Sequence, residues 1–342
     1  MPFYRYIISA KSPLPNIHYT CIAKTTTINT IPTINLADFL SGDAERKNNF
    51  VQSLGKAYQE VGFVAVQNHG INQQLVDDFY KAVEQFFALP DEVKLQYEVP
   101  GLAGQRGFTS FGKEHAKNSS AGDLKEFWQI GQTIEDGEVV SDHYPENVKV
   151  KEISAFNELG YNLYRGFEKS GRSLLQSLAL FLGLDEHYFD EKIHNGNSIL
   201  RAIYYPPITQ EPASAIRAEQ HEDINLITLL VGASADGLEV MDTAGNWVAV
   251  KTAPTEIVVN VGDMLQRLTN NVLRSTTHRV VNPPREKWHT PRFSIPFFLH
   301  PKSEMSLNCL PDCVTESNPL AYEPITAGEY LDERLREIGL KK

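Results

Sequence analysis

The second half of the chain is divided into short segments rich in β-branched and aromatic residues, and this spacing limits the fold more than any other feature. Proline, glycine and asparagine separate the segments. Several short strands at close intervals are typical of a β-sandwich or a barrel. A β-core is therefore expected here. The predicted strands are Ile199–Tyr205, Ile224–Val231, Leu238–Met241, Trp247–Val250, Ile257–Val261, Thr277–Val281 and Phe293–Leu299.

The first half is predicted to be mainly helical. Apolar residues recur at helical spacing from Asn48 to Glu60, with Asp38 or Ser41 as candidate caps. A second helix is expected to stop at Pro90, and a longer one should run over residues 152–182. We expect these helices to pack outside the β-core.

The organisation along the chain predicts one domain after an N-terminal extension. Residues 1–30 carry no clear pattern and form the expected extension. The single domain should span residues 31–342. Within it we expect a mainly helical region at 31–197, a β-core at 198–300 and a C-terminal segment with a helix at 301–342.

Charge and cysteine content narrow the class of protein. The 342 residues carry a formal net charge of −11, which disfavours sequence-independent binding to nucleic acid and binding to an anionic membrane. No apolar run approaches the length of a membrane span. The three cysteines, Cys21, Cys309 and Cys313, are too few for a disulfide framework. Reduced thiols in a cytoplasmic protein are the expected state.

A histidine and a carboxylate stand two residues apart, at His221 and Asp223. They open a strand-like segment, in which residues i and i+2 point to one face. Such a pair could supply two metal ligands from one rigid element. The pattern also occurs often by chance, and a single histidine more often makes a core hydrogen bond than a metal bond.

A third ligand is available at His278, in another strand-like segment. An antiparallel core could place it opposite His221. Two histidines and one carboxylate on one face leave several positions of an octahedron open, which suits iron(II). Catalytic zinc accepts the same three ligands, so the ligand set does not decide the metal.

A possible anion site lies further along the chain. Arg292 and Ser294 stand two residues apart in an apolar strand-like segment, so both should face one side. The arginine could grip a carboxylate with two hydrogen bonds, and the serine hydroxyl could add a third. Tyr205, just before Pro206, could add its phenol. Alternatively, Arg292 pairs with a distant acid and Tyr205 is an ordinary core or rim aromatic.

The order of these segments resembles a known family. YYPP, HEDINLITLL, THRVVNP and RFSIPFFLHP follow one another as in the 2-oxoglutarate- and iron(II)-dependent dioxygenases related to isopenicillin N synthase. The segments IPTINLADFL, VGFVAVQNHGI and DLKEFWQIG also resemble that family. The likeness covers nearly the whole chain from about Ile31, and the combined motifs are far more specific than any one of them.

The resemblance implies a double-stranded β-helix, or jelly roll, with flanking helices. It implies Fe(II) bound by His221, Asp223 and His278, and 2-oxoglutarate as cosubstrate with O2. The C5 carboxylate of 2-oxoglutarate would meet Arg292 and Ser294, with Tyr205 assisting. The implied reaction yields succinate and carbon dioxide while a small molecule is hydroxylated or desaturated.

Other functions remain open on the same fold. Isopenicillin N synthase uses no 2-oxoglutarate, so a ring-closing iron oxidase is an alternative. A non-catalytic binding protein is another, which the intact ligand set disfavours. A hydrolytic zinc enzyme would not need the arginine and serine. Many plant members carry asparagine where this chain has Ile203. This difference weakens the inference that the substrate is a plant hormone or a flavonoid.

The substrate is expected to be a small molecule, with no nucleic acid or membrane partner and no pattern that specifies an oligomeric state. Five residues are candidates for the substrate pocket, although ordinary core packing explains each of them singly as well. Arg201 shares a strand face with Ile203 and Tyr205, and three phenylalanines could line the pocket from separate segments. The five candidates are Arg201, Ile203, Phe111, Phe127 and Phe298.

Overall fold

The computed structural model describes most of the chain after its first 29 residues. The expected N-terminal extension, except for Thr30, and Cys21 therefore lie outside the described residues. The described ranges are residues 30–102, 104–114, 122–134, 137–138, 144–212, 215–338 and 340–341.

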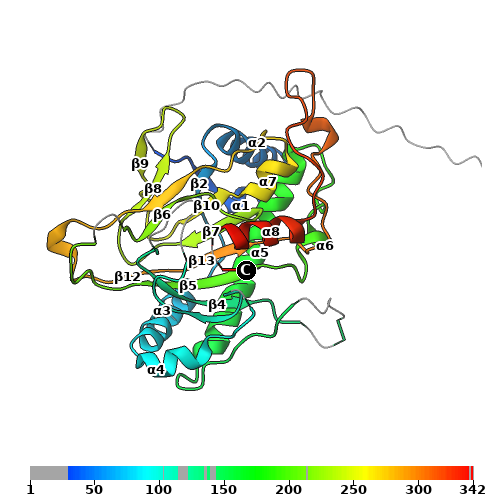
Figure 1. Ribbon diagram of the computed structural model, residues 1–342. Helices are drawn as coiled ribbons and strands as arrows, with labels where there is room; N and C mark the ends of the chain where they lie inside the picture. Colours follow the sequence, from blue (N-terminus) through cyan, green and yellow to red (C-terminus); the bar gives the residue numbers. More distant parts are fainter. Residues whose placement is uncertain are drawn as a thin grey trace, which may run out of the picture.

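Two β-sheets form the centre of the described structure (Figure 1). The larger sheet has nine strands, in the order β1-β2-β10-β7-β13-β5-β4-β3, with β12 also paired to β5. Its strands are β1 (Thr33–Asn35), β2 (Phe63–Gln67), β3 (Gly107–Thr109), β4 (Glu126–Gly131), β5 (Ile199–Tyr205), β7 (Ile227–Val231), β10 (Ile257–Val261), β12 (Arg292–Ser294) and β13 (Pro296–Leu299). The smaller sheet, in the order β6-β11-β8-β9, contains β6 (Ala218–His221), β8 (Leu238–Met241), β9 (Trp247–Ala249) and β11 (His278–Val280).

The two sheets pack against each other through a small apolar cluster. Phe63 and Ala65 of β2 and Val258 of β10 meet Val240 of β8 there, all of them buried. A pocket lined by residues of both sheets lies beside this cluster, and Asp223 and His278 are among its polar side chains. The sandwich expected from the short strands is therefore present.

Helices cover the other face of the larger sheet. The long helix α5 lies along it, where Phe167 stacks on Phe297 of β13 with ring centroids 5.4 Å apart. Helices α2 and α3 pack against α5 in turn (Figure 1). The helices are α1 (Leu36–Phe39), α2 (Ala44–Glu60), α3 (Gln73–Phe87), α4 (Asp91–Lys94), α5 (Phe156–Phe181), α6 (Asp190–Ile193), α7 (Asp263–Leu268) and α8 (Ala327–Glu337), and the 3-10 helices are η1 (Leu95–Tyr97), η2 (Arg285–Lys287) and η3 (Pro311–Cys313).

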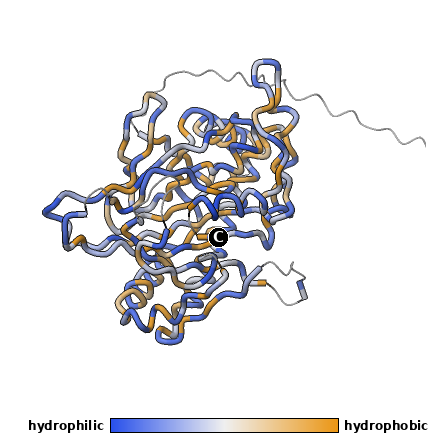
Figure 2. Tube along the Cα trace, in the orientation of Figure 1, coloured by the Kyte–Doolittle hydropathy of each residue, from blue (hydrophilic) through white to orange (hydrophobic). Residues whose placement is uncertain are grey.

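Hydropathy follows this arrangement. The apolar stretches of the chain run through the inner strands and the facing sides of the helices, while polar stretches lie mostly in outer turns (Figure 2). No helix in the described ranges is both long and apolar enough to cross a bilayer. Cys309 and Cys313 are free thiols.

Several predicted boundaries were wrong, for local reasons. Helix α2 begins at Ala44 because the Asp43 carboxylate accepts hydrogen bonds from the backbone N–H groups of Glu45 and Arg46, so neither Asp38 nor Ser41 caps it. The strand expected from Ile224 begins only at Ile227. The residues before it turn back towards α7, which changes the geometry of the site.

Candidate metal centre and its pocket

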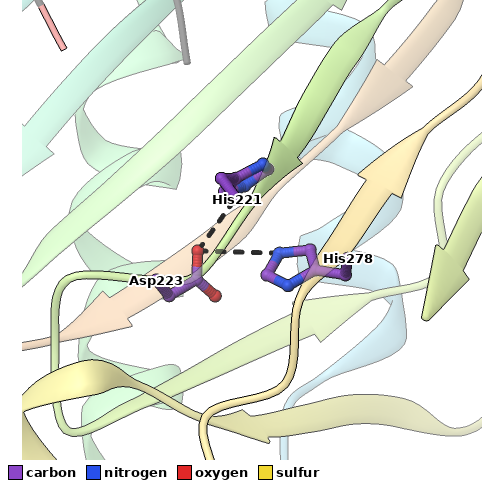
Figure 3. Close-up of side chains that lie close together, drawn as sticks. All are labelled: His221, Asp223 and His278. Carbon is purple, nitrogen blue, oxygen red and sulfur yellow. Dashed lines mark ion pairs between the residues drawn. The ribbon is translucent and has the colours of Figure 1, made fainter. Parts of the chain in front are cut away.

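His221 and His278 are brought together by direct strand pairing. His221 ends β6 and His278 begins β11, and the two residues are partners in the antiparallel register. Asp223 follows His221 in the turn between β6 and β7. The Oδ1 atom of Asp223 lies 3.9 Å from Nε2 of His221 and 3.7 Å from Nε2 of His278 (Figure 3). One ligand atom from each residue lies within 4.8 Å of the others.

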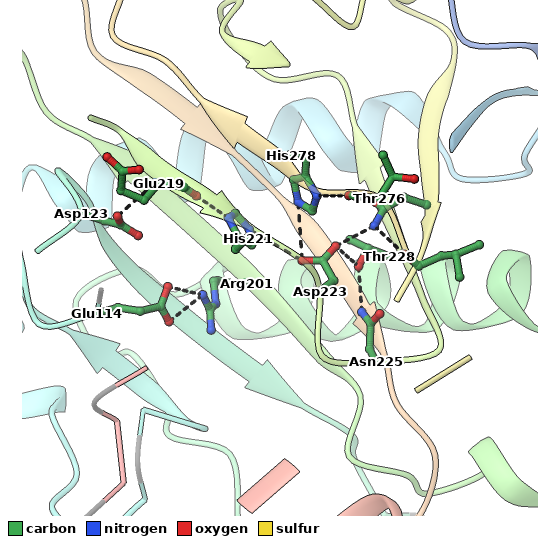
Figure 4. Close-up of polar contacts among 12 residues, drawn as sticks. Glu114, Asp123, Arg201, Glu219, His221, Asp223, Asn225, Thr228, Thr276 and His278 are labelled. Carbon is green, nitrogen blue, oxygen red and sulfur yellow. Dashed lines mark hydrogen bonds and ion pairs between the residues drawn. The ribbon is translucent and has the colours of Figure 1, made fainter. Parts of the chain in front are cut away.

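The strand alternation expected for His221 and Asp223 was wrong, because the strand ends at His221. A turn places the carboxylate instead. The backbone carbonyl of Asp223 accepts a hydrogen bond from the N–H of Asp263, and the Oδ2 atom accepts from Thr228 Oγ1 at 2.6 Å and Asn260 Nδ2 at 2.8 Å. Figure 4 shows Thr228 and Asn225 around the carboxylate. Only Oδ1 is left to face the two histidines.

Backbone carbonyls fix the tautomers of both histidines. His221 Nδ1 lies 2.6 Å from the Glu219 carbonyl and His278 Nδ1 lies 3.1 Å from the Thr276 carbonyl (Figure 4). A carbonyl only accepts, so each Nδ1 carries the proton and each Nε2 presents a lone pair. Burial, and then the neighbouring His278, lowers the pKa of His221 to about 4, so this ring is neutral near neutral pH.

With both rings neutral, three electron-pair donors therefore converge: the two Nε2 atoms and Oδ1 of Asp223. Such a set needs a cation, and it fits a divalent transition metal held by two imidazoles and one carboxylate. The carbonyls behind the histidines and the donors behind Asp223 are the kind of supporting shell that metal ligands have. The residues thus fit the iron that the family resemblance implied.

A second group of side chains lies at another part of the same pocket. Arg292 of β12 is directly opposite Tyr205 of β5, and Ser294 is opposite Ile203. The guanidinium lies 5.0 Å from the Tyr205 ring centroid. All four side chains line the pocket. Arg292 and Ser294 therefore reach the same pocket, as their spacing predicted, while the pairing of β12 with β5 was not predicted.

Arg292 has no acidic partner among the described residues. Its side chain is 2% exposed, its Nε donates to the Ala235 carbonyl, and its Nη1 has no hydrogen-bond partner. Arg217, also 2% exposed, lies 5.9 Å from the Tyr205 ring and has an unpartnered Nε. Burial, and then the nearby Arg292, lowers the pKa of Arg217 to about 10. Two buried cations without a counter-ion favour an anionic ligand here.

The opposite part of the pocket has balanced charges. Arg201 of β5 donates from Nε to Gln129 at 2.7 Å and from Nη1 to both carboxylate oxygens of Glu114 at 3.1 Å. Lys125 lies 2.7 Å from Glu114 and 2.8 Å from Asp123. We call these five residues the Arg201 wall (Figure 4 shows Arg201 with Glu114).

The electrostatics of this wall agree with its contacts. Burial alone would raise the pKa of Glu114, but Arg201 and Lys125 outweigh it and lower the pKa to about 2. Glu114 is therefore ionised throughout the neutral range. The two cations and two carboxylates neutralise one another within the protein.

Sequence reasoning missed part of the pocket. Leu331, Leu335 and Ile338, from α8 and its end, also line it, as does His300 at the end of β13. The i, i+4, i+7 spacing of the three apolar residues could have indicated an inward helix face. His300 lacks a nearby carboxylate in sequence, and only the alternation from Phe298 to His300 along the strand could have found it.

The five predicted substrate residues do not all reach the pocket. Arg201, Ile203 and Phe298 line it. Phe127 is buried beneath Arg201, whose guanidinium lies 4.1 Å from the ring centroid. Phe111 is 49% exposed and is not part of the pocket lining, because the chain turns outward after β3. Gln105, in the glycine-rich segment of residues 101–112, lines the pocket instead.

Two family models match the chain. Residues 31–152 match the model described as "non-haem dioxygenase in morphine synthesis N-terminal". Residues 196–301 match the model described as "2OG-Fe(II) oxygenase superfamily". The second match contains the three converging residues together with Arg292 and Ser294.

Individual relatives agree with these models. The proline hydroxylase buaE of Petromyces alliaceus is 31% identical, over 88% of this chain and 97% of that protein. A crystal structure of a 2OG-Fe(II) oxygenase family protein from Caulobacter crescentus is 42% identical, with a TM-score of 0.81 over 91% of this chain and 100% of that one. A full-length Neurospora crassa protein, crystallised in complex with alpha-KG and thymine, is 28% identical, with a TM-score of 0.79 over 93% of this chain and 99% of that one. These likenesses confirm a mainly β fold with a jelly-roll core and flanking helices.

Proposed function

Because the chain belongs to the 2OG-Fe(II) oxygenase superfamily, we propose that His221, Asp223 and His278 hold the iron of this enzyme. The protein is a 2-oxoglutarate-dependent dioxygenase that uses Fe(II), 2-oxoglutarate and O2. The convergence of two Nε2 lone pairs on one free carboxylate oxygen supports this ligand set.

The cosubstrate site follows from the unpaired arginine. We assign Arg292 and Ser294 to the C5 carboxylate of 2-oxoglutarate, with Tyr205 beside them. The buried Nη1 of Arg292, without a hydrogen-bond partner in the described chain, is the observation that carries this assignment. A carboxylate held there would receive charge-assisted hydrogen bonds and would neutralise a buried cation. Arg217 adds positive potential from behind the Tyr205 ring.

Bound iron and 2-oxoglutarate supply oxygen activation, in which 2-oxoglutarate is oxidatively decarboxylated to succinate and carbon dioxide. The chain's own residues orient the reactants and exclude water. Thr228 and Asn260 hold the Asp223 carboxylate in place, and Phe63 packs edge-on against His278 with ring centroids 5.5 Å apart. Apolar residues of α8 line the pocket and help to exclude water from it.

The oxidised substrate is a small molecule bound beside the metal centre, and the expected reaction is hydroxylation or desaturation. Coupling to 2-oxoglutarate separates this function from that of a ring-closing iron oxidase, in which all electrons come from the substrate. Relatives named as 2-oxoglutarate-dependent enzymes favour the coupled reaction, whereas the unpaired Arg292 alone does not separate the two, since it would hold a substrate carboxylate equally well. The wide core that joins residues of both halves also supports a single domain over residues 31–342.

The test is spectroscopic. Iron(II) and 2-oxoglutarate are added anaerobically to the wild-type protein and to two variants, His221→Ala and Arg279→Lys. Arg279→Lys is the control, because Arg279 forms an ion pair with Glu239 and does not line the pocket. A weak visible absorption band is expected with the wild type and with Arg279→Lys, and it should be lost in His221→Ala. A band of unchanged strength in His221→Ala would rule out the ligand assignment. In air, succinate should form only with the two proteins that show the band.

A further inference from the structure

The charge of the pocket differs between its two ends, and this difference constrains the substrate. Around Tyr205 there are two buried arginines, Arg292 and Arg217, without an acidic partner in the described chain. In the Arg201 wall, two cations and two carboxylates are paired at 2.7 to 3.1 Å. An anionic group is therefore neutralised at the first end and meets a site of zero net charge at the second.

Moving an ionised group from water into a buried site is costly unless an opposite charge receives it. At the Arg201 wall the available cations are already engaged, because Arg201 contacts Glu114 and Lys125 contacts both Glu114 and Asp123. A substrate carboxylate would have to compete with these fixed carboxylates. Glu222, which also lines the pocket, would repel it further. An uncharged group avoids this cost.

The wall nevertheless keeps hydrogen-bonding capacity for a ligand. Arg201 uses Nε and Nη1 within the protein, while its Nη2 has no partner among the described residues. Its guanidinium lies 5.2 Å from the ring centroid of Phe298. Free N–H groups on the pocket surface favour an acceptor such as a carbonyl oxygen.

His300 supplies the complementary group. It lines the pocket, is 7% exposed, and its buried Nδ1 has no hydrogen-bond partner in the described structure. Burial, opposed by Asp223 and reinforced by Arg201, lowers the pKa of His300 to about 3, so the ring is neutral. A neutral imidazole offers one acceptor nitrogen and one donor. A buried polar side chain without a partner is costly, so this ring favours a ligand that pairs with it.

We propose that Arg201 and His300 are specificity-determining residues that select an uncharged substrate bearing an amide, lactam or imide group over a carboxylic acid. The carbonyl oxygen accepts from Arg201, and the amide N–H donates to His300. Phe298 lies two residues before His300, and its ring, whose centroid is 5.2 Å from the Arg201 guanidinium, also lines the pocket and offers an apolar surface for the flat group. This inference rests on the proposed function, because it places the substrate beside the metal centre.

The test compares matched pairs of amide and acid. Nicotinamide with nicotinate, and benzamide with benzoate, are titrated near neutral pH into anaerobic protein holding iron(II) and 2-oxoglutarate, and binding is measured by ligand-observed NMR. Each amide should bind about tenfold tighter than its acid, the equivalent of one lost hydrogen bond or more. In His300→Leu the amides should weaken by about tenfold, again by loss of one hydrogen bond.

Glu114→Gln gives the sharper result. It leaves Arg201 with a neutral partner, so acid binding should strengthen by about tenfold or more while amide binding changes little. Glu186→Gln is the matched control, since it removes a carboxylate from the distant pair with Lys47 and should change neither affinity.

Three outcomes would overturn the inference: acids that bind wild-type protein as tightly as the amides, acid binding unchanged in Glu114→Gln, and no binding of any probe. The visible band of the iron and 2-oxoglutarate complex is recorded on every variant. If the band is present, such a result contradicts the substrate class alone. If wild-type protein lacks the band, the proposed function itself fails. Thermal unfolding of each variant confirms that it is folded.

Discussion

His278 stands directly opposite His221 in the antiparallel pairing of β11 with β6, with ring centroids 4.4 Å apart. The two histidines thus reach one metal through strand register and not through closeness in sequence. A one-residue slip would turn His278 to the other face of the sheet. The turn that carries Asp223 is anchored independently, by hydrogen bonds to Asp263 and Thr228.

The first prediction concerns the support of Asp223. Thr228→Val keeps the shape of the side chain but removes the hydroxyl that donates to Oδ2 at 2.6 Å. Supporting hydrogen bonds of this kind typically change metal affinity 10- to 100-fold, so the dissociation constant for iron(II) should rise by about that factor. Competition with a chelating dye under anaerobic conditions measures it.

The control for this change is Thr276→Val. Its hydroxyl donates to the Val61 carbonyl, while the backbone carbonyl that holds His278 is retained. Iron affinity should stay within about twofold of the wild type in this control, because no ligand loses a partner. Equal losses in both variants would mean that stability, and not ligand positioning, controls iron binding.

The second prediction separates charge from geometry at Arg292. Arg292→Gln removes the cation, which should weaken 2-oxoglutarate binding by about 2–5 kcal/mol, or roughly 30-fold and more. Arg292→Lys keeps the charge but loses the planar pair of donors, so its loss should be intermediate. Isothermal titration with 2-oxoglutarate under anaerobic conditions gives both values. Unchanged affinity in Arg292→Gln would remove this residue from the cosubstrate site.

The sequence predicted the features that depend on local spacing. Strand β5 was predicted at its observed bounds, because β-branched and aromatic residues end at a proline. Arg292 and Ser294 line one pocket, as predicted, because both lie on a regular strand, where alternation determines direction. The pairing of His278 with His221 also agrees.

Features that depend on tertiary contacts were not predictable in the same way. The strand argument for Asp223 was wrong because a hydrogen bond from α7, about 40 residues downstream, and one from Thr228 at the start of β7 hold its turn. Phe111 follows β3 at a turn, where alternation no longer applies. In the Arg201 wall, Glu114, Asp123 and Lys125 lie beside β5, which begins more than 70 residues later in the chain. No spacing rule connects these segments, so their ion pairs could not be predicted.

The third prediction compares two glycines of α5. A Cβ atom at Gly171 would collide with Leu299 of β13, whereas a Cβ atom at Gly166 meets no heavy atom within 4 Å. Gly171→Ala should destabilise the protein by about 1–3 kcal/mol through overpacking. Gly166→Ala should stabilise it by about 0.5–1 kcal/mol, because alanine favours the helix. Urea unfolding of both variants tests this, and the same sign for both would contradict the packing of α5 on the sheet.

The fourth prediction concerns pH and Asp263. Burial, and then the nearby carboxylate of Glu222, raises the pKa of Asp263 from 3.8 to about 7. Between these values the folded protein holds a proton that the unfolded chain has lost. Stability from this group is therefore present at low pH and falls as the pH rises towards 7, by on the order of 1 kcal/mol per pH unit.

Asp263→Asn removes this dependence, while the amide oxygen can still accept the hydrogen bond from Tyr330. The variant should gain stability relative to the wild type as the pH rises from about 5 to about 8, because only the wild type loses a bound proton over that range. The free energy of unfolding in urea, with chelator present, measures the difference at each pH. Asp236→Asn, at an exposed position, should show no such trend. A difference between Asp263→Asn and wild type that is constant with pH would mean that Asp263 is ionised in the folded protein throughout this range.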